Sequence, residues 1–261
     1  MNTRLSRAVV AVSIDLEVAG TQQERVTPRA VEEVAFWLLD VLNQCELPAT
    51  WAVADPTNSA TGERILSLGS RNELAILGEA AWVGREAGRG RFGREMARRI
   101  VQNHNAAPIS TLVLRSGELG ELSDLAIKHG ITAVRPAASS TASRPARWQP
   151  QTLRYGLWSF PTSHTLPGSS RWLPGGGGLR AVRASIDRAI EARGLFHLTI
   201  DAPHLVLRGP SAQRVVERVL QYAQRRSRQG ELEVANLRML AERLSNQQQS
   251  QPRHSILRPA A

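Results

Sequence analysis

Carboxylate, guanidinium and imidazole side chains stand at the ends of short apolar runs in this sequence. The chain has only six aspartates, and Asp15 and Asp201 each follow such a run directly. Asp55 follows another run, but Pro56 comes next, which favours a turn or a helix cap there. Further reactive groups occupy equivalent positions: Glu17, Glu79, Arg115 and His204. This spacing predicts a site assembled from several segments of the chain, with carboxylates at its centre.

Carboxylates gathered in this way can hold a metal, a proton or a polyol. Asp15 and Glu17 are the candidate metal ligands. With Glu79 and Asp201 they would form an all-oxygen set, which suits Mg²⁺ or Ca²⁺ better than Zn²⁺. A metal-free acid–base pair is the alternative, because like charges close together raise the pKa of at least one carboxyl group. Cys45 is the only cysteine, so a disulfide framework and a zinc site built on paired cysteines are excluded.

Aromatic and imidazole side chains near the same run ends have two interpretations each. Trp82 and Trp158 could stack on a sugar ring, and with Glu79 they are the candidate substrate-binding residues; packing at the edge of the core is the alternative for both tryptophans. His197 lies inside an apolar run, which favours a buried, hydrogen-bonded histidine. His204, after Asp201, is therefore the stronger site candidate.

The elements that must position these residues alternate between apolar runs and helical spacing. Strands are expected at 8–12, 49–54, 73–77, 111–114, 131–134, 157–160, 195–200 and 232–235. Helices are expected at 28–45, 60–68, 91–105, 118–129, 179–193, 212–228 and 237–244. This rhythm predicts an α/β protein with a parallel sheet, best fitted by a TIM-like β/α barrel of about seven strands, with a doubly wound sheet as the alternative. We expect one domain over residues 1–245 and a disordered tail at 246–261.

Composition and charge limit the classes of partner. The 261 residues carry a net charge of +10, with 32 arginines and one lysine, Lys128. Arginine clusters at 85–99 and 214–228 contain interleaved glutamates and no nucleic-acid-binding motif, so they predict solvated helix faces rather than a nucleic-acid site. No apolar run reaches the roughly 18 residues of a membrane span, and the N-terminal run lacks a cleavage site. These features predict a cytoplasmic protein without a membrane span.

Seven segments follow one another in an order that resembles a known family. They read SIDLE, PATWAV, NELAILGEAAW, LVLRSGE, HGITAVRP, GLWSFPTS and FHLTIDAPH. Their order is similar to that of the polysaccharide deacetylases, the NodB-homology group of carbohydrate esterases, over roughly residues 8–206. The resemblance implies a distorted β/α barrel and hydrolysis of the amide bond of an acylated amino sugar.

The resemblance also implies roles for single residues. Asp15 matches the family's catalytic base, and Arg115 retains its arginine. The closing strand carries Asp201 where the family has a histidine, with His204 three residues later. The family's two metal-binding histidines fall on Leu77 and Ala81, neither of which can bind a metal. The divalent metal that the resemblance implies is therefore in conflict with the residues present.

Two functions follow as hypotheses. The first is a hydrolase of carbon–nitrogen bonds with Asp15, Arg115, Asp201 and His204 as catalytic residues, acting on a carbohydrate or a small acylated substrate. The second is a catalytically degenerate barrel, a pseudoenzyme that binds a carbohydrate or a protein partner without turnover. The missing histidines favour the second, whereas the retained acidic residues and Arg115 favour a surviving site of some kind.

Overall fold

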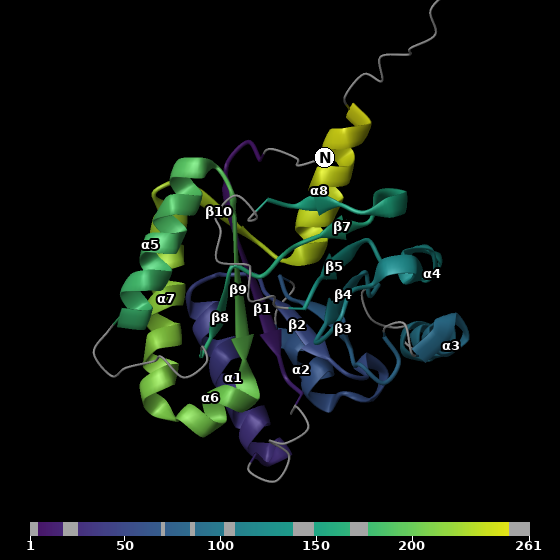
Figure 1. Cartoon of the computed structure of the whole chain (residues 1–261). Helices are drawn as coiled ribbons and strands as arrows, with labels where there is room; N and C mark the ends of the chain where they lie inside the picture. The colour runs from purple at the N-terminus through teal and green to yellow at the C-terminus, as the bar shows by residue number, and fades with distance from the viewer. Residues whose placement is uncertain are drawn as a thin grey trace, which may run out of the picture.

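The structure is a computed structural model, and it describes residues 5–17, 26–68, 71–83, 87–101, 108–137, 149–167 and 177–250. Helices pack around one curved sheet in this part of the chain (Figure 1). The α/β class predicted from the sequence is confirmed.

The sheet contains ten strands, joined in the order β6-β7-β5-β4-β3-β2-β1-β9-β8, with β10 also paired to β1. All pairs are parallel except β6 with β7. The strands are β1 Ala8–Asp15, β2 Thr50–Val53, β3 Glu73–Gly78, β4 Thr111–Leu114, β5 Ala133–Arg135, β6 Gln151–Thr152, β7 Trp158–Ser159, β8 His164–Leu166, β9 Leu195–Asp201 and β10 Leu232–Ala235.

The segment between β7 and β8 links the two sides of the curled sheet. The backbone N–H of Phe160 donates to the carbonyl of Val134 in β5 at 2.8 Å, and that of Ser163 donates to the carbonyl of His197 in β9 at 2.9 Å. The β/α-barrel architecture expected from the sequence is therefore present, in a curled form in which β6 and β8 stand at the two ends of the strand order. The strand number differs from the expected seven or so because β6 and β8 are very short and polar, so neither forms an apolar run in the sequence.

Eight α-helices and three short 3₁₀ segments are described. The helices are α1 Pro28–Gln44, α2 Ala60–Leu68, α3 Gly88–Val101, α4 Ser123–Lys128, α5 Gly177–Ala192, α6 Ala202–Arg208, α7 Pro210–Arg228 and α8 Leu237–Ser250. The 3₁₀ segments are Pro56–Asn58, Gly120–Leu122 and Arg154–Gly156. The helix expected at 118–129 is divided into the 3₁₀ segment Gly120–Leu122 and α4. Helix α6 was not predicted, because its seven residues are too few to show a helical period. Helix α8 continues into the expected tail as far as Ser250, and residues 251–261 lie outside the described chain.

Side-chain caps begin the elements next to the sheet edge. The Thr27 side chain accepts a hydrogen bond from the N–H of Ala30 at 3.3 Å, and Pro28 is the first residue of α1, as predicted. Asp55 caps the 3₁₀ segment after β2 by accepting from the N–H of Thr57 at 3.1 Å. The capping interpretation of Asp55 is confirmed.

The two faces of β1 show how the sheet separates core from site. Ala8, Val10, Val12 and Ile14 point toward the helices and join the core around α1, α5 and α7. The alternate residues face the inside of the curled sheet, where Val9 and Ala11 belong to a second buried cluster. Ser13 and Asp15 continue that inner row. The interior of the barrel therefore becomes polar toward the C-terminal end of β1.

Candidate functional site

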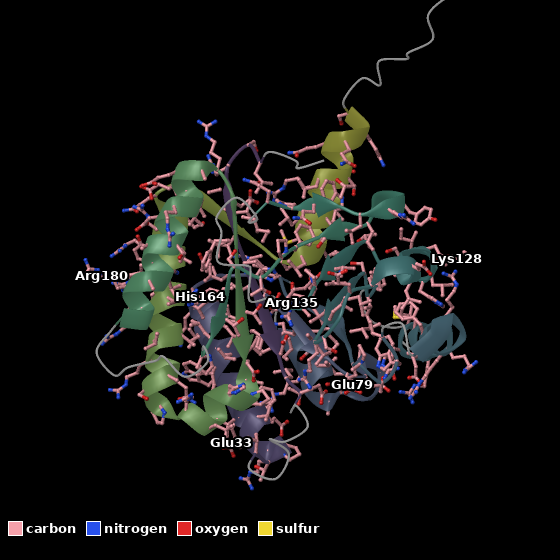
Figure 2. The ribbon with its side chains drawn as sticks, viewed as in Figure 1. Glu33, Glu79, Lys128, Arg135, His164 and Arg180 are labelled. Carbon is pink, nitrogen blue, oxygen red and sulfur yellow. The ribbon has the colours of Figure 1, made fainter. Side chains whose placement is uncertain are left out.

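Asp15 and Arg135 form a buried ion pair at the C-terminal edge of the sheet. Asp15 is the last residue of β1 and Arg135 the last of β5, and Nη2 of Arg135 donates to Oδ2 of Asp15 at 2.6 Å. Only 4% of the Arg135 side chain and 13% of the Asp15 side chain are exposed. Figure 2 shows Arg135 lying among the strands. The sequence analysis missed Arg135, although it ends an apolar run just as Asp15 does.

The second carboxylate oxygen of Asp15 and the second terminal nitrogen of Arg135 are buried as well. Oδ1 of Asp15 and Nη1 of Arg135 have no hydrogen-bond partner within the described chain. The two groups therefore meet through one hydrogen bond rather than two, and the guanidinium neutralises the carboxylate from the inner side of the barrel.

Asp201, at the end of the neighbouring strand β9, and His204, in α6, form a hydrogen-bonded pair. Asp201 ends β9 and is the register partner of Asp15, so the two residues lie side by side, with about 4.8 Å between adjacent strands. Oδ1 of Asp201 accepts from the N–H of His204 at 2.9 Å, and Oδ2 lies 2.9 Å from Nδ1 of the imidazole. The His204 side chain is 41% exposed. The structure thus brings Asp15, Asp201 and His204 to one edge of the sheet.

Arg115 and Glu17 both make hydrogen bonds to the backbone next to the strand ends. Arg115 follows β4, and its Nη2 donates to the backbone carbonyl of Glu17, whereas the guanidinium bound to Asp15 is that of Arg135. Oε1 of Glu17 accepts from the N–H of Ala54 at 3.0 Å. The Arg115 side chain therefore holds the chain after β1 in place by bonding to the backbone of Glu17.

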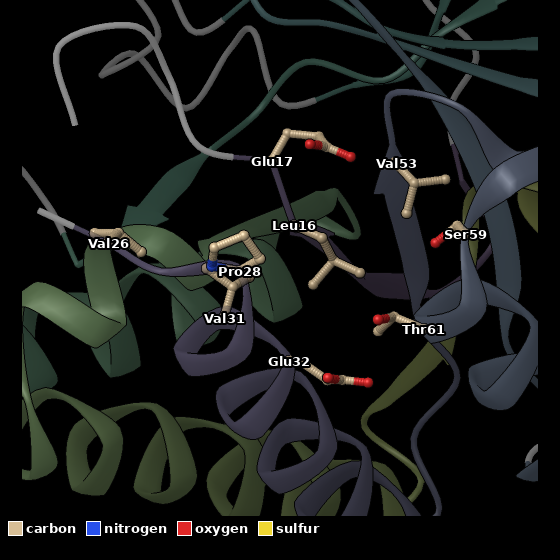
Figure 3. A pocket seen from close by; sticks show the side chains of 9 residues that line it. All are labelled: Leu16, Glu17, Val26, Pro28, Val31, Glu32, Val53, Ser59 and Thr61. Carbon is tan, nitrogen blue, oxygen red and sulfur yellow. The ribbon is translucent and has the colours of Figure 1, made fainter. Parts of the chain in front are cut away.

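Glu17 also lines a cavity of about 340 Å³ between α1, α2 and the ends of β1 and β2. Figure 3 shows its carboxylate at one side of this cavity and that of Glu32 at another, with Leu16 between them. The cavity lining is Leu16, Glu17, Val26, Pro28, Val31, Glu32, Val53, Ser59 and Thr61. Several of these side chains belong to the core around α1, so the Glu17 carboxylate faces a different space from the Asp15 carboxylate.

The candidate sugar-stacking tryptophans are core residues, which corrects the interpretation as substrate-binding groups. Trp158 is fully buried, and its Nε1 donates to Oγ of Ser245 in α8 at 2.9 Å. Trp82 is 2% exposed, packs on Phe92 and lies beneath the guanidinium of Arg99, 4.7 Å from the ring centroid. Neither indole offers a face to a sugar ring. The alternative of core packing is confirmed for both.

Glu79, the third candidate for substrate binding, follows β3 at the same edge of the sheet and is partly exposed (Figure 2). Its backbone carbonyl accepts from the N–H groups of Trp82 and Val83 at 3.1 and 2.9 Å. The turn after β3 thus holds Glu79 at the rim while Trp82 turns into the core.

His197 is a buried, hydrogen-bonded histidine, as predicted. Its Nε2 lies 2.7 Å from Oγ of Ser13, and its Nδ1 lies 3.1 Å from the carbonyl oxygen of Phe160. Burial, reinforced by the positive charge of Arg135, lowers the pKa of His197 to about 3. The imidazole is therefore neutral near pH 7 and supports the strand ends from inside the barrel.

The residues at this edge do not fit a divalent metal. No group of three histidine, cysteine, aspartate or glutamate side chains able to hold one occurs among the residues described. Leu77, which the sequence resemblance matches to one of the family's metal-binding histidines, lies in a fully buried cluster with Ala52, Ala75 and Val113. The Asp15 carboxylate already carries a cation, since Arg135 is bonded to it. The predicted ligands Asp15 and Glu17 thus face different surroundings, and no mechanism through a metal follows from this site.

No helix within the described ranges is both long and apolar enough to cross a membrane.

Comparison with known proteins supports the fold. No protein-family model matches the sequence, and no curated protein matches it either. A structure from Mycobacterium smegmatis, assigned as a polysaccharide deacetylase, has a TM-score of 0.68 at 16% identity and covers 100% of both chains. A second with that assignment, from Pseudomonas aeruginosa PAO1, has a TM-score of 0.66 at 11% identity and covers 91% of each chain.

A third similar structure is a mutant of a CE4-family pseudoenzyme from Bacillus anthracis with restored enzymatic activity. Its TM-score is 0.53 at 10% identity, and the match covers 90% of this chain and 68% of that one. The TM-scores establish a shared fold in spite of the low sequence identities. This shared fold agrees with the order of motifs in the sequence. The chain has the curled β/α-barrel fold of the polysaccharide deacetylases.

Proposed function

We propose that this protein is a carbohydrate-binding barrel that has lost metal-dependent deacetylation. The observation that carries the proposal is the ion pair between Asp15 and Arg135, 2.6 Å apart and largely buried. The resemblance implies that this aspartate acts as the base toward a metal-bound water. Here the Arg135 guanidinium occupies Oδ2 of Asp15, and no group of three metal-binding side chains occurs among the described residues. The sequence resemblance matches Leu77 and Ala81 to the family's two metal-binding histidines, and neither side chain can bind a metal. This also supports the loss of metal-dependent deacetylation.

Carbohydrate is the proposed ligand because the proteins of similar fold are assigned as polysaccharide deacetylases. The rim retains polar groups suited to hydroxyls, namely Glu79, Asp201 and His204, and two of these are joined by hydrogen bonds that fix their orientation. One similar structure is a mutant of a pseudoenzyme, so a degenerate site has a precedent among proteins of this fold. We place the protein in the cytoplasm as part of the same proposal.

Isothermal titration with acetylated chitooligosaccharides, combined with an assay for released acetate, tests the proposal. We expect binding without acetate, with or without added Zn²⁺, and weaker binding for Asp201→Asn, which removes an acceptor at the rim. The control is Asp124→Asn on α4, whose carboxylate pairs with Arg89 on the protein surface. Metal-dependent release of acetate by the wild type, or the absence of binding to any glycan, would overturn the proposal.

A second candidate function is metal-free hydrolysis of an amide bond. The 2.9 Å contact between Asp201 Oδ2 and His204 Nδ1 favours it, because a carboxylate that orients an imidazole prepares it for general-base work. This function predicts acetate release in EDTA that is lost in His204→Ala. Equal activity of the variant and the wild type would contradict it.

A further inference from the structure

One exposed face of α7 consists of arginines. Arg214, Arg218, Arg225 and Arg228 are all exposed, and their spacing of four, seven and three residues places them on one side of the helix. We call these four residues the α7 stripe. At 1.5 Å per residue it is about 21 Å long. Ser211 and Gln221 are the other exposed residues in this row.

Acidic residues do not neutralise most of the α7 stripe. Glu217, the only acidic residue of α7, is partly buried, and its Oε1 accepts from Nε2 of Gln221 at 3.1 Å. Arg214 and Arg218 take part in no ion pair within the described chain, and Arg228 approaches Glu46 at 3.7 Å with both side chains 65% exposed. Exposed pairs of that kind contribute little. The helix has five arginines and one glutamate, a net +4 of the chain's +10.

The other arginine cluster of the sequence has different surroundings. On α3, Arg89 pairs with Asp124 at 2.6 Å and Arg98 lies 3.7 Å from Asp55. These contacts join α3 to its neighbours, as expected of a solvated helix face with local partners. In the α7 stripe, Arg225 lies over the ring of Tyr222 and Arg228 approaches Glu46, whereas Arg214 and Arg218 have no ion pair within the described ranges, as is also true of Arg91 and Arg94 on α3. On the adjacent helix α5, Arg180 also points outward (Figure 2).

One short helix, α6, separates the candidate site from the start of the helix that carries the α7 stripe. Asp201 ends β9, α6 follows it directly, and Gly209 joins α6 to α7, so Arg214 lies one helical turn beyond the start of α7. At the far end Arg228 lies near Glu46, which precedes β2, and therefore at the opposite edge of the sheet. A polymer bound at the rim could continue along this helix.

We propose that the α7 stripe binds an anionic polysaccharide, so that the ligand of this barrel is a glycan carrying carboxylate or phosphate groups. This inference rests on the proposed carbohydrate binding. Guanidinium groups bind carboxylate and phosphate oxygens through paired hydrogen bonds. A stripe of about 21 Å exceeds a single sugar unit, so the partner is a polymer rather than a monosaccharide.

The side chains of the stripe favour a glycan over other polyanions. It offers no exposed aromatic ring on which a base could stack, since Tyr222 is partly buried beneath Arg183 and Arg225. The exposed row of six residues formed by the stripe, Ser211 and Gln221 also offers no apolar side chain that could enter a bilayer. Its length and charge suit a flexible chain with regularly spaced acidic groups.

The test compares two double variants of equal charge. Arg214→Gln/Arg218→Gln removes two cations from the stripe, and Arg91→Gln/Arg94→Gln removes two exposed cations from α3 that have no ion pair in the described chain. Binding is measured for polygalacturonate oligosaccharides, for a phosphate-bearing mannan and for neutral chitohexaose at several salt concentrations. We expect the α7 variant to lose roughly tenfold in affinity for at least one anionic glycan and to show a weaker salt dependence, because fewer counterions are displaced. The α3 variant should match the wild type.

Each other outcome has a defined meaning. Equal losses in both variants, or none in either, would overturn the inference, as would tighter binding of duplex DNA or of phosphatidylglycerol vesicles through the same arginines. Neutral chitohexaose separates this inference from the proposed function. If it binds and α7 has no effect on any anionic glycan, only the α7 stripe inference fails; if no glycan binds at all, the proposed function fails.

Discussion

The carboxylate of Asp15 and the guanidinium of Arg135 meet at 2.6 Å although 120 residues separate them in the chain. The contact joins the ends of β1 and β5 across the inside of the curled sheet. It also places a guanidinium directly on the carboxylate that the sequence resemblance matches to a catalytic base. The proposed loss of metal chemistry and the stability of the fold thus depend on the same two side chains.

Removing Arg135 should destabilise the protein strongly. Arg135→Met leaves the Asp15 carboxylate buried without its cation, which typically costs about 3–5 kcal/mol. The double variant Arg135→Met/Asp15→Asn should recover part of this loss, because no charge then remains buried. Urea unfolding of the wild type, both single variants and the double variant measures the coupling. Additive losses would show that the pair is not energetically linked.

Trp158 should matter for folding and not for ligand binding. Trp158→Phe removes the hydrogen bond to Ser245 and leaves a small cavity beside α8, at a cost of about 1–3 kcal/mol. Thermal unfolding should shift accordingly, while affinity for chitooligosaccharides stays at the wild-type value. A loss of affinity without a loss of stability would show instead that Trp158 takes part in ligand binding.

The buried Glu73 carboxyl should make the protein less stable as the pH rises. Burial raises its pKa from 4.5 to about 7, although Thr50 donates to its Oε1 at 2.6 Å and the N–H of Arg238 at the start of α8 donates to Oε2 at 3.0 Å. The folded state therefore holds the proton more tightly than the unfolded state does. Its stabilisation is complete below about pH 4.5 and is lost as the pH rises through 7, at up to about 1.4 kcal/mol per unit. Glu73→Gln should remove this fall in the free energy of unfolding between pH 5 and pH 8.

His197 should act in the opposite direction. Burial and the charge of Arg135 lower its pKa from 6.5 to about 3, so the unfolded chain binds the proton more tightly. The resulting stabilisation is present above about pH 6.5 and is lost as the pH falls toward 3. Between pH 4.5 and 6.5 the two groups offset each other in the wild type. His197→Gln should then expose the slope due to Glu73; a curve parallel to that of the wild type would contradict this assignment.

Sequence periodicity predicted the parallel strands and most helices because each buries an apolar face that repeats along the chain. It missed α6, whose seven residues complete two turns, and β6 and β8, whose residues are mainly polar. It also stopped the fifth strand at residue 134, one residue before Arg135. Asp15 is a candidate because it stands at the end of a strand. With the fifth strand extended by one residue, the same criterion selects Arg135.

The site was harder to predict than the fold because contacts across the barrel depend on strand order. Asp15 and Asp201 follow apolar runs, and parallel register brings them together. Position alone could not decide between Arg115 and Arg135 as the partner of Asp15, since Arg115 follows β4 and Arg135 ends the adjacent strand β5. Trp82 and Trp158 lie near strand ends too, but burial against Phe92 and against α8 turns them away from the rim.

The zinc content of the purified protein after equilibration with Zn²⁺ and gel filtration tests the central claim most directly. The account predicts far less than one zinc per chain, unchanged in Asp15→Asn, because Arg135 holds Asp15 and no imidazole pair stands beside it in the part of the chain that the structure describes. One zinc per chain in the wild type, lost in Asp15→Asn, would contradict it.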